Sequence, residues 1–214
     1  RAALHDAGDL WGLDSYRTQE EVRRVLGEPK ARVSCIGPAG EQRVPMAAVM
    51  NDHGRAAART GLGAVMGAKK LKAIAVRGSA AVPLADAARL KALAREIVAG
   101  VDEDLAAMSI RMAGTAGYLD MALMYGDLPI RYYQLGEWEE ASNLSGVLMV
   151  EQFQNRNTAC YRCPIACGRE TRAPRHGLDK VDGPEYETLG ALGTLVQVAD
   201  LEDVIYANHL CNVY

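Results

Sequence analysis

Several features typical of other protein classes are scarce in this 214-residue chain. It holds a single Phe and 6% aromatic residues, too few for the stacking surfaces that bind single-stranded nucleic acids. Its formal net charge is -3, so it lacks the excess of Lys and Arg that phosphate backbones require. No segment approaches the ~20 apolar residues of a membrane span, and the first residues do not form a signal peptide. We therefore expect a cytoplasmic protein with no nucleic-acid partner and no membrane span.

The composition fits an ordinary folded protein. Hydrophobic residues make up 49% of the chain and charged residues 24%, which disfavours a disordered or a disulfide-stapled chain. The length allows one large domain or two smaller ones. Both the opening RAALHDAGDLWGLDSY and the closing HLCNVY resemble the interior of a larger structure. We expect an internal piece of a longer chain.

Three of the five cysteines fall within eight residues, in the segment CYRCPIACG. These are Cys160, Cys163 and Cys167, whereas Cys35 and Cys211 stand alone. An odd, tightly spaced cluster in a chain without a signal peptide favours a metal site over a disulfide framework. Short gaps of two and three residues let successive sulfurs point toward one centre.

The spacing of these thiols leaves two metals open. Iron-sulfur clusters use cysteines spaced in this way, and Pro164 next to the second Cys fits that use. Zinc is the structural alternative, with a fourth ligand taken from His176, His209 or Cys211. For either metal no Cys follows Cys167 closely, so the missing ligand is distant or outside this chain.

Residues 54–78 combine spaced glycines, a basic cluster and an apolar run. The glycines are Gly61, Gly63 and Gly67, and the lysines are Lys69, Lys70 and Lys72. Glycines allow backbone amides to approach an anion, and Lys supplies the countercharge, so a ligand that carries phosphate is one interpretation. The spacing matches neither a dinucleotide-binding fingerprint nor a P-loop. A tight turn with its lysines in solvent is the equally open alternative.

Taken in order, segments along nearly the whole chain resemble the aldehyde ferredoxin oxidoreductase family. The segments are IGPAGE (36–41), TGLGAVMGAKKLKAIAVRG (60–78), GTAG (114–117), LPIRYYQ (128–134), CYRCPIACG (160–168), GPEYETLGALG (183–193) and ANHLCN (207–212). The resemblance implies a parent chain roughly three times as long.

The resemblance also implies two cofactors. Members of this family hold a tungsten ion between two pterins, and no residue here excludes molybdenum in its place. A 4Fe-4S cluster lies near one pterin, with three ligands that correspond to Cys160, Cys163 and Cys167 and a fourth beyond Tyr214. Cys35 and Cys211 would then be ordinary small buried residues.

Pterin contacts of the family fall on two places in this chain. They correspond to Arg59, Thr60, Gly61, Leu62 and Gly63 in the turn, and to Asn212 as the first residue of a second element. Ala58 and Thr60 replace glycines common in the family, and Thr60 narrows the backbone conformations open to the turn.

The family's active-site carboxylate corresponds to Glu187, with Glu185 as the second choice, both in GPEYET. Beside a metal-bound oxygen a carboxylate can take or relay a proton, and burial raises its pKa for that work. The structural alternative is that both residues begin a helix, where acidic side chains are favoured. Some relatives carry an E-x-x-H metal site at a dimer interface, but here Tyr206 stands three residues before His209, so that interface metal is not expected.

The fold class expected is α+β. Residues 1–80 are assigned to the end of a mixed N-terminal sheet domain that binds pterin, and residues 81–214 to a mainly helical, truncated domain that carries the cluster cysteines. Periodicity predicts helices at 20–26, from 84 onward, and at 116–125, 186–198 and 202–213, the last with Asp200 as N-cap. Strands are expected at 32–36, 44–50 and 71–76.

The resemblance implies oxidation of a small aldehyde to a carboxylic acid, with electrons passed to ferredoxin or to an electron-transfer subunit. A homo- or hetero-oligomer is compatible with this reading. A related catalytic subunit that acts on other carbonyl or acyl substrates is the first alternative. A zinc-binding structural module is the second, although it leaves the glycine-lysine segment and GPEYET unexplained.

Overall fold

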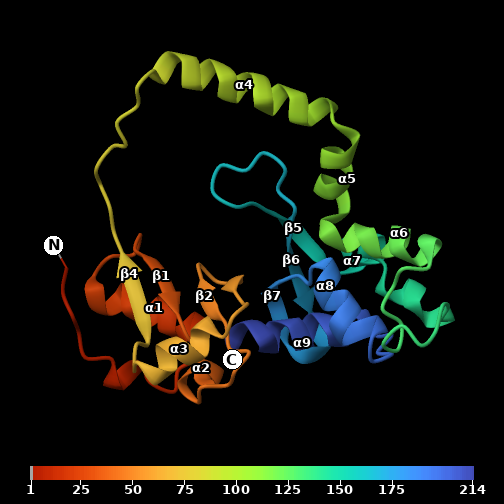
Figure 1. The fold of residues 1–214 in the computed structure, drawn as a ribbon, viewed down its shortest axis with the longest axis horizontal. Helices are drawn as coiled ribbons and strands as arrows, with labels where there is room; N and C mark the ends of the chain where they lie inside the picture. The colour runs from red at the N-terminus through yellow and green to blue at the C-terminus, as the bar shows by residue number, and fades with distance from the viewer. Residues whose placement is uncertain (1) are drawn as a thin grey trace. The chain divides into compact units, whose positions relative to one another are not determined.

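The computed structural model describes residues 2–214, which form two compact units (Figure 1). Unit 1 comprises residues 2–81 together with Leu210–Tyr214, and unit 2 comprises Val82–His209. Each unit combines helices with an antiparallel sheet, so the fold class is α+β as predicted. Within residues 2–214, no helix has both the length and the apolar character to cross a bilayer.

Unit 1 is built around a four-stranded antiparallel sheet in the order β3-β2-β1-β4. Its elements are the short 3₁₀ helix η1 (Gly8–Leu10), α1 (Ser15–Leu26), β1 (Arg32–Cys35), α2 (Pro38–Glu41), β2 (Val49–Asn51), β3 (Arg55–Ala57), α3 (Leu62–Ala68) and β4 (Ala73–Val76). Asp14 caps α1 by accepting a hydrogen bond from the Arg17 amide at 2.8 Å, and Gly27 ends the helix in the left-handed conformation.

The core of unit 1 is a small apolar cluster between α1 and the sheet. Val22 of α1 packs on Val33 and Cys35 of β1 and on Met50 of β2. Val33 and Cys35 are alternate residues of one strand, so both point to the same face. The predicted strand at 32–36 is therefore confirmed.

Glycines bring α2 and α3 into backbone contact. A Cβ atom placed on Gly67 would lie 1.8 Å from the Gly40 carbonyl oxygen, and one placed on Gly63 would lie 2.6 Å from the Ala47 oxygen. The Gly63 amide donates to that same Ala47 oxygen at 3.0 Å. Only residues without a side chain permit this approach, which fixes the start of α3 against the segment before β2.

Lys72 and Glu41 form an ion pair that is almost completely removed from solvent. Their side chains are 0% and 3% exposed. The Lys72 ammonium also donates to the Leu13 carbonyl at 2.7 Å, and the Glu41 carboxylate accepts from the Gly12 amide at 2.9 Å. Because each charge has further hydrogen-bond partners, the pair can exist in the interior.

Unit 2 contains most of the helices and a three-stranded antiparallel sheet in the order β5-β6-β7. Its helices are α4 (Ala87–Glu103), α5 (Leu105–Ala113), α6 (Tyr118–Tyr125), α7 (Gly146–Gln152), α8 (Tyr186–Leu189) and α9 (Leu201–Val213), and α9 belongs to unit 1 from Leu210 onward. Its strands are β5 (Gln154–Thr158), β6 (Gly168–Ala173) and β7 (Leu178–Asp182). Short 3₁₀ helices η2 (Thr115–Gly117), η3 (Glu139–Leu144) and η4 (Pro174–His176) and a π-helical turn η5 (Gly190–Thr194) complete it.

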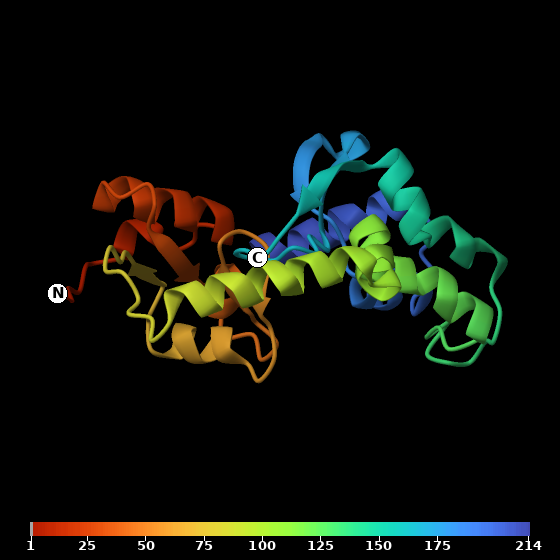
Figure 2. The ribbon, with the colours of Figure 1, turned by 90° about the horizontal axis from the view of Figure 1, so that it is seen from above.

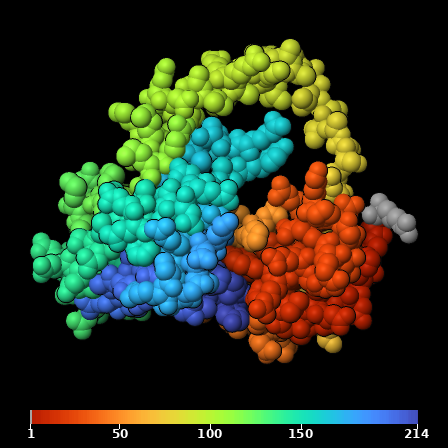
Figure 3. Space-filling model, turned by 180° about the vertical axis from the view of Figure 1, so that it is seen from behind, coloured from red at the N-terminus to blue at the C-terminus, as the bar shows by residue number. Residues whose placement is uncertain are grey.

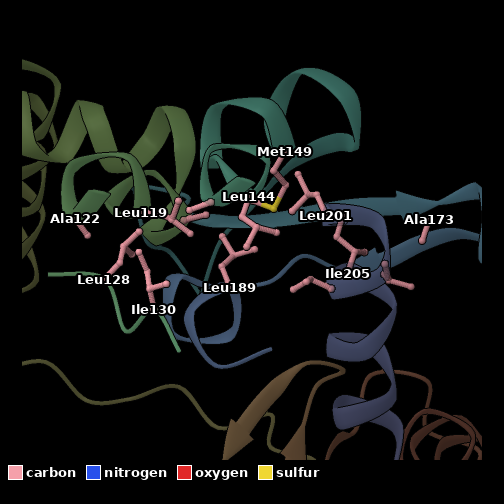
Figure 4. Close-up of a cluster of buried hydrophobic side chains, with 14 residues drawn as sticks. Leu119, Ala122, Leu128, Ile130, Leu144, Met149, Ala173, Leu189, Leu201 and Ile205 are labelled. Carbon is pink, nitrogen blue, oxygen red and sulfur yellow. The ribbon is translucent and has the colours of Figure 1, made fainter. Parts of the chain in front are cut away.

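One apolar core joins the elements of unit 2, and Figure 4 shows its side chains converging from helices and sheet. Leu119 of α6, Leu144 of η3, Met149 of α7, Leu189 of α8 and Ile205 of α9 are all 0% exposed. Burying a side chain of this size stabilises the fold by about 1.5–3 kcal/mol. The core thus holds together helices that are far apart in the sequence.

Helix α4 differs from the other helices of unit 2 because none of its residues is buried. Figures 1 and 2 show it as one uninterrupted helix. Leu90, Leu93, Ile97 and Val98 recur at helical spacing, yet each is about half exposed. Asp86 begins the helix by accepting a hydrogen bond from the Arg89 amide, so the helix predicted from residue 84 starts three residues later.

Two sequence predictions are wrong in part. Residues 44–48 form turns, with the Ala47 amide bonded to the Val44 carbonyl, and only Val49–Asn51 pairs as a strand. The α-helix predicted at 186–198 ends at Leu189. A π-helical turn over Gly190–Thr194 follows it, in which the Leu195 amide donates to the Gly190 carbonyl.

Two predicted helices are confirmed, whereas four strands were not predicted. The helices at 20–26 and 202–213 are present, and the Asp200 carboxylate accepts from the Asp203 amide at 3.1 Å, as an N-cap does. Strand β3 and the whole sheet β5-β6-β7 were not predicted. The sequences of β5 and β6, QNRNT and GRETRA, carry few apolar residues, and β3 is only three residues long.

Replacing Gly67 with Ala tests the contact between α2 and α3. The added methyl group would collide with a backbone oxygen, so we expect unit 1 to lose at least about 3 kcal/mol of unfolding free energy. Gly100→Ala is the matched control, since Gly100 also lies in a helix but has open space around it, and it should stabilise by about 0.5–1 kcal/mol. Urea unfolding followed by circular dichroism measures both, and equal effects would contradict the contact.

Candidate functional site

The three clustered cysteines lie on the loop between β5 and β6. The pair Thr158 and Gly168 closes this hairpin, and the Cys163 amide donates to the Cys160 carbonyl at 3.0 Å to form a turn inside it. Arg162 and Ala166 both adopt left-handed backbone conformations, with φ of 56°. The loop stands at the surface in Figure 3, in the colour of residues near 160, and Tyr161 is 81% exposed.

The structure brings the three thiols onto one loop but not to one point. Cys160 is exposed, whereas Cys163 and Cys167 are half-buried, and no disulfide involves them in the part of the chain that is described. Between residues 2 and 214, no three His, Cys, Asp or Glu side chains are gathered closely enough to hold a metal ion. Of the candidate zinc ligands, His176 and His209 of unit 2 therefore form no such group with the loop, and Cys211 belongs to unit 1.

The chemistry of this donor set nevertheless fits an iron-sulfur cluster. The loop offers three thiols within eight residues and no carboxylate between them. Its second end is anchored where Gly114, with φ of 64°, approaches the Cys167 backbone, so that a Cβ atom there would lie 2.7 Å from the Cys167 oxygen. Zinc also accepts thiolates, so the donor set alone does not separate the two metals.

A narrow crevice lies behind the anchored end of the loop. It is lined by residues from α5, η2, β6 and the segment before α8, among them Gly114, Thr115, Cys167, Arg169 and Glu185. Arg169 is a buried cation, and burial lowers the pKa of its guanidinium, while Cys167 and Glu185 act in the opposite direction. Three chemically different groups thus meet beside the cysteine loop.

The two carboxylates of GPEYET occupy different environments. Glu185 is half-buried at the start of α8, and its carboxylate accepts a hydrogen bond from the Thr115 hydroxyl. The same hydroxyl accepts from the Tyr186 amide at 3.0 Å. Glu187, the residue favoured from the sequence, lies one position into α8 and is exposed. The geometry links Glu185, rather than Glu187, to the crevice beside the cysteines.

The predicted pterin turn is an exposed turn at the start of α3. Thr60 and Gly61 have left-handed φ angles of 66° and 69°. A Cβ atom placed on Gly61 would lie 2.8 Å from the Pro45 carbonyl oxygen. Arg59, Thr60 and Leu62 are exposed, and Gly63 is buried against Ala47. The turn thus combines one exposed Arg side chain with a tightly packed glycine backbone.

Asn212, the second predicted pterin contact, belongs to the last turn of α9. Its backbone carbonyl accepts a hydrogen bond from the Ser15 hydroxyl at 2.6 Å. The Ala39 amide similarly donates to the Tyr214 carbonyl at 3.0 Å. These bonds attach residues 210–214 to unit 1, the unit that also carries the glycine turn.

The remaining cysteines differ from each other. Cys35 is 0% exposed, as predicted, and its thiol donates to the Ser15 carbonyl at 3.3 Å. Burial is the main cause that raises the pKa of this thiol from 9.0 to about 11. Cys211 is exposed, so its prediction as a buried residue is wrong. It lies near the end of α9, where the helix has a face open to solvent.

A basic groove occupies the opposite end of the unit 1 sheet from the glycine turn. Arg23, Lys30, Arg32 and Arg77 line it together with Asp52, which pairs with Arg32 at 2.9 Å. Arg32 begins β1 and Arg77 follows β4, whereas the glycine turn follows the far end of β3. None of the residues predicted to bind a cofactor lines this groove.

Sequence reasoning missed two residues of the crevice, Thr115 and Arg169. Both lie in or beside segments that were singled out, since Thr115 belongs to GTAG and Arg169 directly follows the Gly168 of CYRCPIACG. No spacing rule points to them, because Thr115 bonds to a residue 70 positions away and Arg169 to one 59 positions away. Arg169 adjoins the loop in the sequence, but only the folded backbone brings Thr115 and the α5 partners of Arg169 to it.

Comparisons with known proteins identify the class. The model of "Aldehyde ferredoxin oxidoreductase, N-terminal domain" matches residues 1–78, and that of "Aldehyde ferredoxin oxidoreductase, domains 2 & 3" matches residues 92–214. Together the two models match 1–78 and 92–214, the segments that carry the glycine turn and the cysteine hairpin, and both describe an oxidoreductase. The chain belongs to the aldehyde ferredoxin oxidoreductase family.

Several relatives extend along almost the whole chain. The tungsten-containing aldehyde ferredoxin oxidoreductases of Pyrococcus furiosus and Thermococcus kodakarensis are 41% and 42% identical over 98% and 99% of it. A protein of Pyrococcus furiosus named "Aliphatic sulfonate oxidoreductase, WOR-like subunit" is 31% identical over 97%. The chain spans about a third of the length of these curated relatives, namely 34%, 35% and 35%.

A solved structure shares the fold. It is the active site complex BamBC of benzoyl coenzyme A reductase with 1,5-dienoyl-CoA, at a TM-score of 0.77 and 25% identity. The match covers 98% of this chain and 33% of that chain. Proteins similar to this chain thus carry names that refer to different substrates.

Replacing Thr115 with Val tests the link between η2 and α8. Val has the same shape but cannot bond Glu185 or the Tyr186 amide, so the free energy of unfolding should fall by about 1–3 kcal/mol. Thr115→Ser keeps the hydroxyl and should remain close to the unchanged protein. Thermal unfolding distinguishes them, and a Ser variant as unstable as the Val variant would contradict the hydrogen bonds.

The buried thiol of Cys35 should resist modification in the folded protein. At pH 8 we expect iodoacetamide to label the exposed Cys160 and Cys211 of the metal-free chain and to spare Cys35, which becomes labelled in urea. Because the pKa of this thiol is 9.0 in the unfolded chain and about 11 in the folded one, its contribution to stability is full below pH 9. That contribution is lost as the pH rises through about 11. Peptide mass spectrometry reads the labelling, and early labelling of Cys35 would contradict its burial.

Proposed function

We propose that this chain is part of an oxidoreductase that converts an aldehyde and water to a carboxylic acid, releasing two electrons and two protons. The electrons pass to ferredoxin or to an electron-transfer subunit. The observation that carries this proposal is the identity of about 40% along nearly the whole chain to proteins named tungsten-containing aldehyde ferredoxin oxidoreductases. The cysteine loop and the glycine turn support it, because each lies in a separate matched segment.

The proposed cofactors are a tungsten or molybdenum bis-pterin centre and a 4Fe-4S cluster. When bound, the metal centre supplies oxygen transfer to the carbonyl carbon and accepts the electron pair, and the cluster passes electrons on singly. The protein's own part is to hold these groups, to exclude competing reactions and to move protons.

The glycine turn is proposed to bind a pterin through its backbone. Arg59, Thr60, Gly61, Leu62 and Gly63 supply amides and one guanidinium on an exposed surface. Asn212 is proposed as a further contact, and its attachment to Ser15 keeps it in the same unit as the turn. The contact of Gly63 with Ala47 holds the turn in place.

Cys160, Cys163 and Cys167 are proposed as three cluster ligands, with a fourth from outside this chain. The hydrogen bond inside the loop and the left-handed residues Arg162 and Ala166 let the backbone reverse direction between the thiols. The half-buried positions of Cys163 and Cys167 reduce access of solvent and oxidants to these sulfurs.

Glu187 is proposed to take the proton from water as it adds to the carbonyl carbon. It lies on the first turn of α8, and Glu185 two residues before it is held by Thr115. Glu185 is the second candidate for this proton transfer, because it lies nearer the cysteine loop. The two carboxylates are separable by experiment.

A second candidate function is that of a related subunit with another substrate. Two relatives favour it: the aliphatic sulfonate oxidoreductase subunit at 31% identity and the benzoyl coenzyme A reductase complex with a TM-score of 0.77. This chain is less similar to these two proteins than to the tungsten-containing aldehyde enzymes, so this function is the second candidate. A panel of aldehydes, aliphatic sulfonates and aromatic thioesters would separate the two functions.

Elemental analysis of the anaerobically purified holoenzyme tests the cofactors directly. We expect about four iron atoms and one tungsten or molybdenum atom per polypeptide. Cys163→Ser should lose iron while keeping the fold, and Cys211→Ser, a thiol outside the loop, should leave the iron content unchanged. Stoichiometric zinc without iron, tungsten or molybdenum would replace the redox proposal by the structural zinc module.

Replacing each carboxylate with its amide tests the proton transfer. Glu187→Gln should lower kcat for aldehyde oxidation by about 10²–10⁴-fold with a viologen dye as acceptor, at unchanged metal content. Glu185→Gln should act mainly on stability, through the hydrogen bond from Thr115. If Glu185→Gln abolishes turnover and Glu187→Gln does not, the proton is moved by Glu185.

A further inference from the structure

A buried guanidinium lies directly behind the cysteine loop. Arg169, two residues after Cys167, is 4% exposed although arginine is seldom buried without a partner. The buried charged residues of unit 2, within the described part of the chain, are Arg169 and Glu202. Its position raises the question of what balances its charge.

The side chain of Arg169 joins the loop to α5 through four carbonyl groups. It donates to the Ala166 and Gly168 carbonyls of the loop at 3.1 and 2.9 Å. It also donates to the Ile110 and Arg111 carbonyls in the last turn of α5 at 3.3 and 2.7 Å. Cations are favoured at the carboxyl end of a helix, where free carbonyl groups accumulate.

One of these bonds stabilises an unfavourable backbone conformation. Ala166 has a φ of 56°, a left-handed conformation that costs a residue with a side chain about 1 kcal/mol or more. The Arg169 guanidinium binds its carbonyl and so holds the backbone immediately before Cys167. The direction of the chain at Cys167 therefore depends on Arg169.

The charge of Arg169 is not neutralised by a carboxylate. Across residues 2–214 it forms no ion pair within 4.0 Å, and its buried Nε atom has no hydrogen-bond partner. The crevice on which it borders is also lined by Cys167 and Glu185. An uncompensated buried cation is costly, so this side of the loop favours a negatively charged group.

We propose that Arg169 is the positioning residue of the cysteine loop and the fixed positive charge that stabilises the reduced form of the cluster held there. The inference rests on the proposed function, since it needs a cluster on Cys160, Cys163 and Cys167. Reduction adds one electron to an already anionic group, and a nearby cation in a medium of low dielectric constant stabilises that added charge. Net charge and hydrogen bonding around a cluster set its reduction potential.

Redox titration of the anaerobic holoenzyme, followed by electron paramagnetic resonance, tests this role. Arg169→Met removes the charge and should shift the midpoint potential of the cluster to more negative values. Arg169→Lys keeps the charge but not the four-carbonyl fork, so its potential should stay near that of the unchanged enzyme while its resonance line shape changes. Arg172→Met is the matched control on the same strand: this exposed guanidinium donates to the Gln152 carbonyl, and its removal should leave the potential unchanged.

The possible outcomes separate this inference from the proposed function. An unchanged potential in Arg169→Met, with iron content intact, overturns the role of the charge and leaves the enzyme assignment standing. Equal negative shifts in the Met and Lys variants overturn it as well. If Arg169→Met folds without iron whereas Arg169→Lys retains the cluster, the role of the charge is supported. If both variants fold but lack iron, the role of the charge is overturned. Absence of iron from the unchanged holoenzyme would instead overturn the proposed function.

Discussion

The buried ion pair between Lys72 and Glu41 is the constraint on which unit 1 depends. It connects the residue directly before β4 to α2, and its remaining hydrogen bonds reach Gly12 and Leu13 near the start of the chain. Since removal of one partner from such a pair costs several kcal/mol, the three segments are tied to one geometry. With α2 fixed, the glycine contacts position α3, and the exposed turn at 59–63 follows from the position of α3.

Unit 2 uses a buried cation differently. Arg169 has backbone carbonyls as partners instead of a carboxylate, so it binds the chain firmly while its charge stays uncompensated. In unit 1 the ion pair is complete within the fold, and its role is structural. In unit 2 the excess positive charge lies in a crevice with Cys167 and Glu185, at one end of the cysteine loop, where an added negative charge would be stabilised.

Much of the local structure was predictable because its signals lie close together in the sequence. Asp200 and the periodic residues after it define α9, and the alternation in Arg32–Cys35 defines β1. The sheet β5-β6-β7 was missed because its strands are polar, exposed in part and stabilised by pairing with each other. The helix after Tyr186 was overextended because the π-helical turn at Gly190–Thr194 has the same apolar spacing as an α-helix.

By itself the sequence determined the family, the three cysteines and the glycine turn, since type and spacing of residues are local properties of the chain. Only the tertiary structure decided that Thr115, Cys167, Arg169 and Glu185 meet at one crevice and that Glu187 is exposed. These contacts join residues up to 70 positions apart. Such pairings depend on how the core of unit 2 packs its helices, and no periodicity in a single segment encodes them.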